Sequence, residues 1–328
     1  MRHAACNAIG QMCTDFCPQI EQKFHHLIIP ALVGVMDDVQ FPRVQAYGAA
    51  AMVNFSENAK KHHISPYLDM IFQRLLILLN TGKRYVQEQA ITSIATVADS
   101  AGDHFVKYYS SIMPLLMNIL RQATQREFRL LRGKTLECAS LVALAVGKEV
   151  FLPDAAQFID LMKSIQESVK DNDDPQSSYL LSAWARICKV LGHDFAPFLE
   201  LVLPPLFASA EVKPDFAVFE EDDQIDTEKY NEDDGWEFVS VEGQKIGIKT
   251  SILEDKCTAV EMLICYAQEM GADFHPYVEK VLGIVVPLFK FYFHDGVRFA
   301  AASVIPFLFK SLFEAKLCNH CFSYFSTR

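Results

Sequence analysis

Apolar residues recur through most of the chain at intervals of three and four, the spacing of helices that bury one face. Near the end of the chain, one such face consists of Val297, Ala300, Ala301, Val304 and Leu308. We find no sustained alternation of apolar and polar residues, which would be typical of half-buried strands. The pattern therefore predicts an all-α protein.

The predicted helices repeat at a nearly constant interval along the chain. Arg2, Arg43 and Arg84 are 41 residues apart, and Arg129 follows after 45. The first three arginines each open a helical stretch rich in small residues, and residues 297–302 resemble these stretches. Because small side chains allow a helix to approach its neighbours closely, we interpret these stretches as the second helices of helical hairpins.

A bulkier helix precedes the second helix of each hairpin. In three of these first helices, two aromatic residues lie three positions apart and a proline follows, as in Phe105, Tyr108 and Pro114, in Phe195, Phe198 and Pro204, and in Phe274, Tyr277 and Pro287. A period of ~40 residues with two helices per repeat is typical of HEAT repeats and exceeds that of tetratricopeptide or ankyrin repeats. We predict an α-solenoid, a right-handed superhelix of HEAT hairpins, over residues 1–310.

The two ends of the chain depart from the regular repeat. Residues 1–15 form only a second helix, so about six complete hairpins follow this half repeat. We therefore expect that the chain lacks its natural beginning and that the uncovered apolar surface of residues 1–15 promotes self-association. Residues 311–328 no longer follow the repeat, and we expect this divergent tail to fray.

The negative charge of the chain is concentrated in one segment. The net charge is -11, and residues 211–237 hold twelve acidic residues against two lysines. We expect an acidic insert at 211–249 that interrupts the sixth hairpin, and its charge argues against direct nucleic-acid binding and favours a basic partner. Two interpretations stay open. The segment is either a solvated loop or a binding segment in which Asp233, Asp234 and Glu237 surround Trp236.

Composition argues against a disulfide-bonded secreted protein and against a membrane protein. The nine cysteines are an odd number and mostly lie in apolar helical patterns, which favours a reducing compartment. The longest apolar runs are about nine residues, short of the ~18 that a membrane span needs. We therefore expect no membrane insertion.

No motif indicates catalysis or a bound cofactor. The Gly-Lys-Thr triplet at 133–135 resembles the end of a phosphate-binding loop but lacks that motif's earlier glycine and its preceding strand. The cysteines at 318 and 321 form an isolated pair, too few ligands for zinc. The histidine pairs at 25–26 and 62–63 have no carboxylates arranged for acid-base chemistry. We therefore expect neither an enzyme nor a cofactor.

Five longer stretches resemble a known family of proteins. They are residues 43–46, 128–135, 182–186, 233–239 and 291–298. Together they look like the middle of an importin-beta-class nuclear transport receptor of the importin-5 type, and the resemblance covers residues 1–310. It implies a karyopherin superhelix that shuttles between cytoplasm and nucleus through the nuclear pore.

The resemblance also implies a set of partners. These are cargo proteins that bear basic nuclear localisation signals, nucleoporins with Phe-Gly repeats, and RanGTP, whose binding releases the cargo. The family's amino-terminal repeats, which dominate Ran binding, have no counterpart here. We therefore do not expect this chain by itself to release cargo in response to RanGTP. The alternative function is a HEAT-repeat scaffold of a multiprotein complex without a transport role.

Polar residues on second helices are the remaining candidates for a cargo site. Glu88 and Glu137 lie on second helices, which line the concave side of this kind of solenoid, and Asn54 and Glu57 end another. Carboxylates and amides on that side would suit an extended basic peptide, and solvated helix faces are the alternative interpretation. We predict that Trp184 packs in the core and is not a ligand platform.

Overall fold

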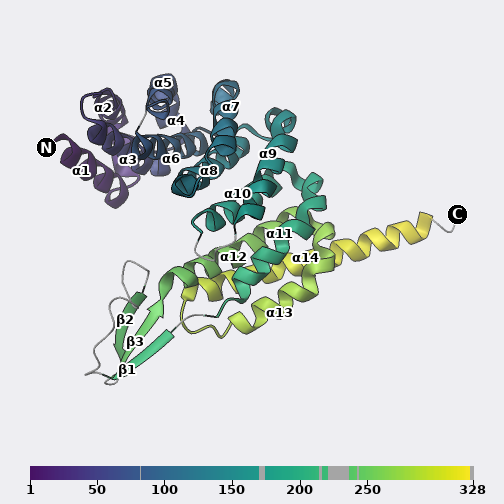
Figure 1. The fold of residues 1–328 in the computed structure, drawn as a ribbon. Coiled ribbons are helices and arrows are strands. Elements are labelled where there is room, and N and C mark those ends of the chain that lie inside the picture. The colour runs from purple at the N-terminus through teal and green to yellow at the C-terminus, as the bar shows by residue number, and fades with distance from the viewer. Residues whose placement is uncertain (82, 170–173, 214–215, 221–235, 242–243, 326–328) are drawn as a thin grey trace. The chain divides into compact units, whose positions relative to one another are not determined.

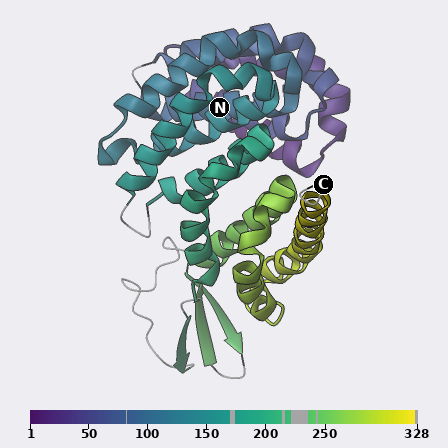
Figure 2. The ribbon, with the colours of Figure 1, turned by 90° about the vertical axis from the view of Figure 1, so that its right-hand side faces the viewer.

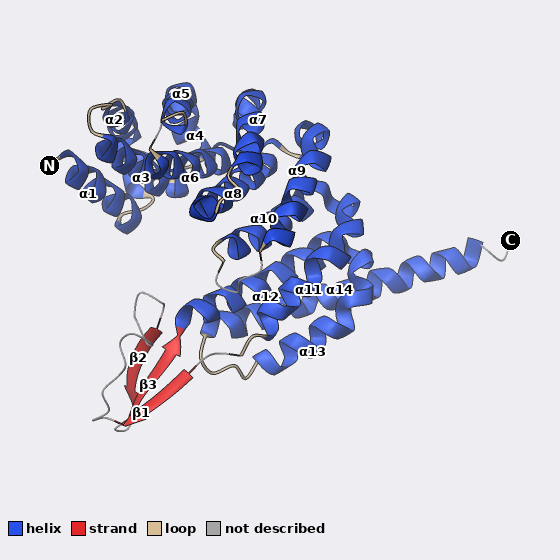
Figure 3. Ribbon diagram, viewed as in Figure 1, coloured by secondary structure: helices blue, strands red, loops and turns tan. Residues whose placement is uncertain are grey.

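The computed structural model describes residues 1–328 except 82, 170–173, 214–215, 221–235, 242–243 and 326–328. The described chain consists mainly of α-helices, with strands in one segment (Figures 1 and 3). It divides into two compact units, residues 1–190 and 191–328. The helical periodicity predicts one array over residues 1–310 and does not indicate this division, which falls next to Gly192, where the backbone takes a positive φ of 59° directly after the end of a helix.

Unit 1, residues 1–190, begins with the single helix α1 (Arg2–Asp15) and continues with four helical hairpins. The hairpins pair α2 (Gln19–Met36) with α3 (Pro42–Asn58), α5 (Leu68–Leu79) with α6 (Arg84–Ala101), α7 (Val106–Gln122) with α8 (Arg129–Val146), and α9 (Lys148–Ser168) with α10 (Gln176–Leu191). Short helical turns precede three of these helices, namely α4 (Lys61–Ile64) with η1 (Ser65–Tyr67), η2 (Gly102–Phe105) and η3 (Arg126–Phe128).

Unit 2, residues 191–328, contains two further hairpins. Their elements are η4 (Gly192–Phe198), α11 (Leu199–Glu211), α12 (Thr250–Met270), η6 (Gly271–Tyr277), α13 (Val278–Leu288) and α14 (Asp295–Phe325). The expectation that the tail frays from residue 311 differs from the structure, because α14 stays helical to Phe325 (Figure 1). The reason lies in Ser311 and Ala315, which are buried and continue the inward face of the helix beyond residue 310.

Second helices stack on one another in chain order: α1 packs against α3, α3 against α6, and α6 against α8. Ser93 Oγ donates a hydrogen bond to the Ala49 carbonyl at 2.5 Å, and the Ser100 hydroxyl donates to the Ser56 carbonyl. In unit 2, Ser311 Oγ lies 3.4 Å from the carbonyl of Ala267. All three contacts join residues 44 positions apart, a period typical of HEAT repeats and longer than that of tetratricopeptide repeats.

A glycine, a short helical turn and a buried phenylalanine connect successive hairpins. Gly102, Gly192 and Gly271 have φ values of 54°, 59° and 51°, a region that glycine enters without steric strain. Three residues after each glycine comes a fully buried phenylalanine, in turn Phe105, Phe195 and Phe274. The first aromatic residue of each pair that the sequence places at the start of a first helix is therefore a core residue at the joint between repeats, whereas Phe198 and Tyr277 are only half-buried.

The segment between α11 and α12 forms a three-stranded antiparallel sheet, which the sequence analysis did not predict. Its strands are β1 (Phe216–Glu220), β2 (Trp236–Val241) and β3 (Gln244–Lys249), in the order β1-β3-β2 (Figure 3). The strands have five or six residues, so each shows only two or three alternations, and the acidic composition of the whole segment outweighed them. Phe238 covers Gly247, where a β-carbon would lie 2.7 Å from the phenylalanine ring.

A buried lysine fixes the point at which this sheet leaves the helices. Lys256 Nζ donates hydrogen bonds to the carbonyls of Ala210 and, at 2.9 Å, Val212, at the end of α11. Burial lowers the pKa of Lys256, and Glu211 opposes that shift. Lys280 forms an ion pair with Glu211. Since β3 runs directly into α12, both ends of the segment are anchored in unit 2 (Figure 2).

By length and hydropathy alone, two helical stretches could cross a membrane. They are Gln176–Glu211, with mean hydropathy 1.2, and Asp295–Leu317, with mean hydropathy 1.4. Both contribute core residues to the fold, including Ile187, Leu203 and Val304. Buried core helices pass the same test, so the absence of membrane insertion stays a prediction from the sequence.

Candidate partner-binding surfaces

A pocket of about 420 Å³ lies between the second helices α3 and α6. It is lined by Arg43, Ala46, Tyr47, Ala50, Tyr85, Glu88 and Gln89. Glu88 Oε1 lies 3.6 Å from Arg84 Nε, beyond hydrogen-bonding distance, and its side chain is 15% exposed. The carboxylate is therefore held in place but keeps oxygen lone pairs for an incoming donor. Sequence reasoning found Glu88 but not the tyrosines beside it.

A second carboxylate occupies the corresponding surface of α8 and α10. Glu137 Oε1 lies 3.6 Å from Arg186 Nη2, and its side chain is 29% exposed. Burial raises the pKa of Tyr179, and the negative charges of Glu137 and Glu88 raise it further. Both carboxylates therefore lie close enough to act on one phenol. Tyr179 reaches this position because Gly133 leaves room for its ring, where a β-carbon would lie 2.4 Å from Tyr179 Cδ2.

The other two candidates of unit 1 lie elsewhere on α3. Asn54 is half-buried against α1, where a β-carbon at Gly10 would lie 3.0 Å from its Nδ2 atom. Glu57 is exposed, close to the end of α3. Asn54 therefore lies at the contact between α1 and α3. The roles of all four residues in binding stay predictions.

The candidates in the insert belong to β2 or to undescribed residues. Trp236 is half-buried opposite Lys249, and Glu237 is exposed opposite Ile248. Because neighbouring residues of a strand point to opposite faces of the sheet, these two side chains do not form one surface as the sequence analysis expected. Asp233 and Asp234 lie outside the described residues.

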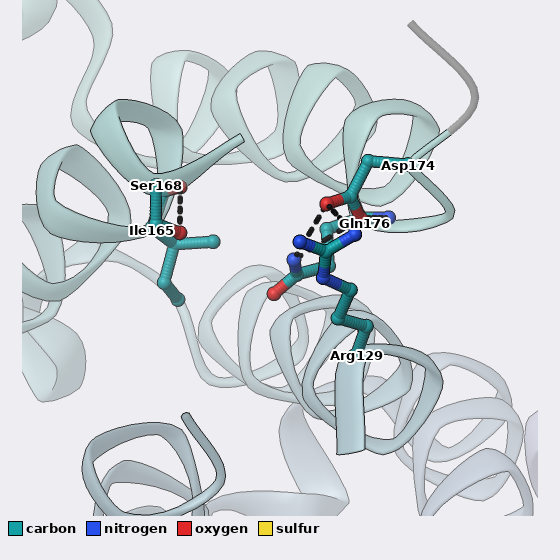
Figure 4. A network of polar contacts seen from close by, with 5 residues as sticks. All are labelled: Arg129, Ile165, Ser168, Asp174 and Gln176. Atoms are coloured by element: carbon teal, nitrogen blue, oxygen red, sulfur yellow. Dashed lines mark hydrogen bonds and ion pairs between the residues drawn. The ribbon is translucent and has the colours of Figure 1, made fainter. Parts of the chain in front are cut away.

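A buried polar network joins α8 to the start of α10 (Figure 4). The Asp174 side chain is fully buried, and its Oδ2 atom lies 3.2 Å from Arg129 Nη1. Its Oδ1 atom accepts a hydrogen bond from the backbone N–H of Gln176 at 2.9 Å, which caps the first turn of α10. Burial lowers the pKa of the neighbouring Arg132, and Asp174 opposes that shift. The network is structural.

Two other sequence predictions concern the same region. Trp184 is buried and donates from Nε1 to Gln166 Oε1 at 2.7 Å, which confirms it as a core residue. Residues 133–135 lie within α8, where Thr135 Oγ1 donates to the Leu131 carbonyl at 2.6 Å. Packing thus accounts for the Gly-Lys-Thr triplet. Over the described residues, no group of three or more His, Cys, Asp and Glu has a metal-binding arrangement.

Two apolar pockets lie beside first helices of unit 1. The larger, about 360 Å³, combines apolar and amide side chains and is lined by Leu79, Asn80, Gln87, Leu115, Asn118, Ile119, Gln122, Ala123, Phe128 and Leu131. The smaller, about 220 Å³, is entirely apolar and is lined by Ile9, Met12, Ile20, Phe24, Leu27 and Ile28. Both have the size and polarity to accept an aromatic or aliphatic side chain of a peptide.

The histidine pairs of the sequence meet where α2 packs against α4. The His25 and His63 rings stack at 5.3 Å, and His62 meets His63 edge-on at 4.0 Å. Tyr67 Oη lies 3.2 Å from His25 Nδ1. His63 is buried, and this burial, together with the positive charges of His62, His25 and Lys60, lowers its pKa. Protonation of His63 is therefore unfavourable in the folded protein.

Acid should destabilise unit 1 through His63. The folded-state pKa lies below the unfolded value of ~6.5, so the neutral ring's contribution is complete above pH ~6.5 and is lost as the pH falls through that value. We expect a thermal unfolding midpoint, followed by circular dichroism, that falls less between pH ~7.5 and ~5.5 in His63→Asn than in the unmodified chain. The exposed His3→Asn is the control and should keep the full pH dependence. Parallel curves for His63→Asn and the unmodified chain would contradict the assignment.

The repeat and its sequence define the class of protein. A family described as "Importin subunit beta-1-like, TPR repeats" matches residues 6–232, and the chain belongs to the importin-beta family of karyopherins. That description names tetratricopeptide repeats, whereas the serine contacts 44 residues apart give these hairpins the length of HEAT repeats.

Individual relatives are similar over most of the chain. Importin subunit beta-3 of Saccharomyces cerevisiae is 42% identical over 96% of this chain and 29% of the relative, and a probable importin-5 homolog of Dictyostelium discoideum is 35% identical over 78% and 22%. The crystal structure of Kap121p bound to Pho4p matches with a TM-score of 0.84 and 42% identity over 96% of this chain and 30% of Kap121p. The chain thus spans less than a third of the length of these relatives. The relatives are named as transport receptors and not as enzymes.

Proposed function

We propose that this chain is part of a nuclear import receptor and that α3, α6, α8 and α10 bind basic segments of cargo proteins. The observation that carries the proposal is a pair of partly exposed carboxylates on second helices: Glu88 lines the pocket between α3 and α6, and Glu137 lies 3.6 Å from Arg186 on α10. Crystal structures of Kap121p bound to Pho4p and to Ste12p support it, because they show that a related array binds other proteins.

The chemistry of this surface suits lysine and arginine. A cation in the pocket beside Glu88 would meet a carboxylate and the side chains of Tyr47 and Tyr85. Such charge-assisted and cation–π contacts gain strength where the groups are partly shielded from water. Because Arg84 and Arg186 stand at 3.6 Å from the carboxylates, an incoming cation replaces loose ion pairs and not short hydrogen bonds.

Charge reversal at the two carboxylates tests the proposal. We expect Glu88→Lys with Glu137→Lys to weaken binding of a lysine-rich peptide by about thirtyfold or more, since each of the two lost charge-assisted contacts contributes roughly 1–3 kcal/mol and about 1.4 kcal/mol corresponds to tenfold in affinity. Fluorescence anisotropy of a labelled peptide measures the affinity. Glu149→Lys with Glu167→Lys is the matched control, because these exposed glutamates of α9 give the same net charge away from the surface. Equal losses in both double variants would reduce the effect to net charge and reject the site.

We further propose that the acidic insert contributes to this recognition, through a cargo signal or a basic surface of Ran. Its charge density supports the proposal, and long-range attraction of this kind acts on the association rate. In the same assay, Asp233→Asn, Asp234→Asn and Glu237→Gln together should slow association and flatten its dependence on salt. If the association rates of both a lysine-rich peptide and RanGTP are unchanged, the acidic insert does not contribute to recognition and acts only as a solvated spacer.

A different assay, retention on immobilised Phe-Gly peptides, separates a transport receptor from a HEAT scaffold. We propose that Phe-Gly segments of nucleoporins enter the apolar pockets beside the first helices, so that the protein passes between cytoplasm and nucleus through the pore. A crystal structure of Kap121p bound to Nup53p supports a nucleoporin as a partner. Retention on immobilised Phe-Gly peptides, lost in Leu115→Asp, favours the receptor, whereas a scaffold has no reason to be retained.

A further inference from the structure

Gly133 interrupts a row of large side chains on the second helices of unit 1. The fourth residue after the arginine that opens each repeat is Tyr47 in α3, Glu88 in α6 and Gly133 in α8. Tyr47 and Glu88 both line the pocket between α3 and α6. In the following repeat, α8 therefore contributes only backbone where the two preceding repeats contribute side chains.

The ring of Tyr179, from α10, fills the place of the missing side chain. A β-carbon at Gly133 would lie 2.4 Å from Tyr179 Cδ2 and 3.0 Å from its Cε2 atom, so the ring rests directly on α8. The side chain of Arg186 fixes α10 in this register, because its Nη1 atom donates to Ser140 Oγ at 3.3 Å and its Nη2 atom lies 3.6 Å from Glu137 Oε1. The position of the ring therefore follows from the packing of α10 on α8.

The Tyr179 ring lies beside both candidate carboxylates. Glu137 follows Gly133 by four residues and so lies one turn further on the same face of α8. Glu88 occupies the position equivalent to Gly133 on α6, the second helix that packs against α8. Burial raises the pKa of Tyr179, and the negative charges of Glu137 and Glu88 raise it further, as expected for a phenol close to both.

Part of the Tyr179 side chain stays exposed to solvent. Tyr179 is half-buried, whereas Trp184 on the same helix is buried and donates to Gln166 at 2.7 Å. A ring that only filled space between helices would be expected to be buried as Trp184 is. An exposed ring beside carboxylates suits the methylene stem of a lysine, which packs on apolar surface while its ammonium group stays with an acceptor.

We propose that Tyr179 binds the stem of a lysine in a basic segment, with the ammonium group directed to Glu88 or Glu137, and that Gly133 is a positioning residue for the ring. This inference rests on the proposed binding of basic segments to the second helices, and it names the part of that surface that recognises the lysine stem in addition to the charge. Because Gly133 acts only through the ring, a side chain at this position removes the ring's contribution without changing any charge.

A double-mutant cycle with the labelled lysine-rich peptide tests the link between the two residues. We expect Tyr179→Ala and Gly133→Ala each to weaken binding about threefold to tenfold, and the double variant to bind no more weakly than Tyr179→Ala alone. Tyr179→Phe keeps the ring and should bind almost normally. Gly34→Ala is the matched control, because a β-carbon at Gly34 meets no atom within 4 Å. Tyr292→Ala removes an exposed ring in unit 2 and should have no effect.

The length of the peptide's basic side chains separates a binding role of Tyr179 from a structural one. A peptide with 2,4-diaminobutyrate in place of each lysine carries the same kind of charge on a shorter stem. The unmodified chain should bind the lysine peptide several times more tightly than this analogue, and Tyr179→Ala should lose most of that preference. A purely structural loss would weaken the binding of both peptides by the same factor.

The outcomes distinguish this inference from the proposed function. Circular dichroism and Trp184 fluorescence check that each variant is folded, and if Gly133→Ala does not fold, the comparison of the two peptides on Tyr179→Ala decides. Additive losses in the double variant, or equal weakening of both peptides by Tyr179→Ala, would overturn the inference. Normal binding by Tyr179→Ala, with a loss in Glu88→Lys with Glu137→Lys, would reject the role of the ring and keep the carboxylate site. Normal binding by all of these variants would reject the site and the inference together.

Discussion

Replacing Asp174 by alanine should lower the free energy of unfolding of unit 1 by about 3 kcal/mol. The carboxylate is fully buried, balances the charge of Arg129 at 3.2 Å and caps the first turn of α10. Without it, the buried Arg132 loses a neighbouring negative charge and the backbone N–H of Gln176 loses its acceptor, and removing one partner from a buried charged network costs far more than the intact network contributes. Denaturant unfolding provides the measurement.

The two tryptophans make this experiment specific to one unit. Trp184 is buried in α10 and reports on unit 1, while Trp236 lies on β2 in unit 2. In a Trp236→Phe background, Asp174→Ala should shift the transition reported by Trp184, and in a Trp184→Phe background the Trp236 transition should move much less. Asp174→Asn keeps an acceptor for the helix cap and should lose less stability. A double-mutant cycle with Arg129→Ala that gives no coupling would show that the ion pair is not the cause.

The helical repeat could be predicted because the spacing between its repeats can be measured in the sequence. A buried face at intervals of three and four, repeated after 41 residues, places second helices at Arg2, Arg43 and Arg84, and the structure starts α1, α3 and α6 within one residue of each. The turns between hairpins also have a recognisable sequence pattern, which was not used in the prediction. A glycine three residues before a buried aromatic residue, as in Gly102 and Phe105, marks the turn between hairpins.

The strands of the insert and the contacts of the candidate site could not be predicted in the same way. A strand of five residues carries too few alternations to stand out within an acidic segment. Glu88 and Glu137 could be assigned to second helices, but their common proximity to Tyr179 depends on a tertiary contact with Gly133. That contact joins residues in two hairpins, and sequence spacing within one helix does not contain it.

Lys256→Met should destabilise unit 2 by about 2 kcal/mol, because it leaves two carbonyls at the end of α11 without their donor while keeping most of the side-chain volume. Lys256→Ala should lose more, since it also leaves a cavity. The matched control is Lys280→Met, which removes an exposed ion pair with Glu211 at the same helix end and should cost less than about 0.5 kcal/mol. Trp236 fluorescence in a Trp184→Phe background follows the transition, because β2 belongs to the segment that Lys256 anchors. Equal stability of Lys256→Met and Lys280→Met would show that the carbonyls at the end of α11 find other donors. In that case Lys256 does not fix the point at which the sheet leaves the helices.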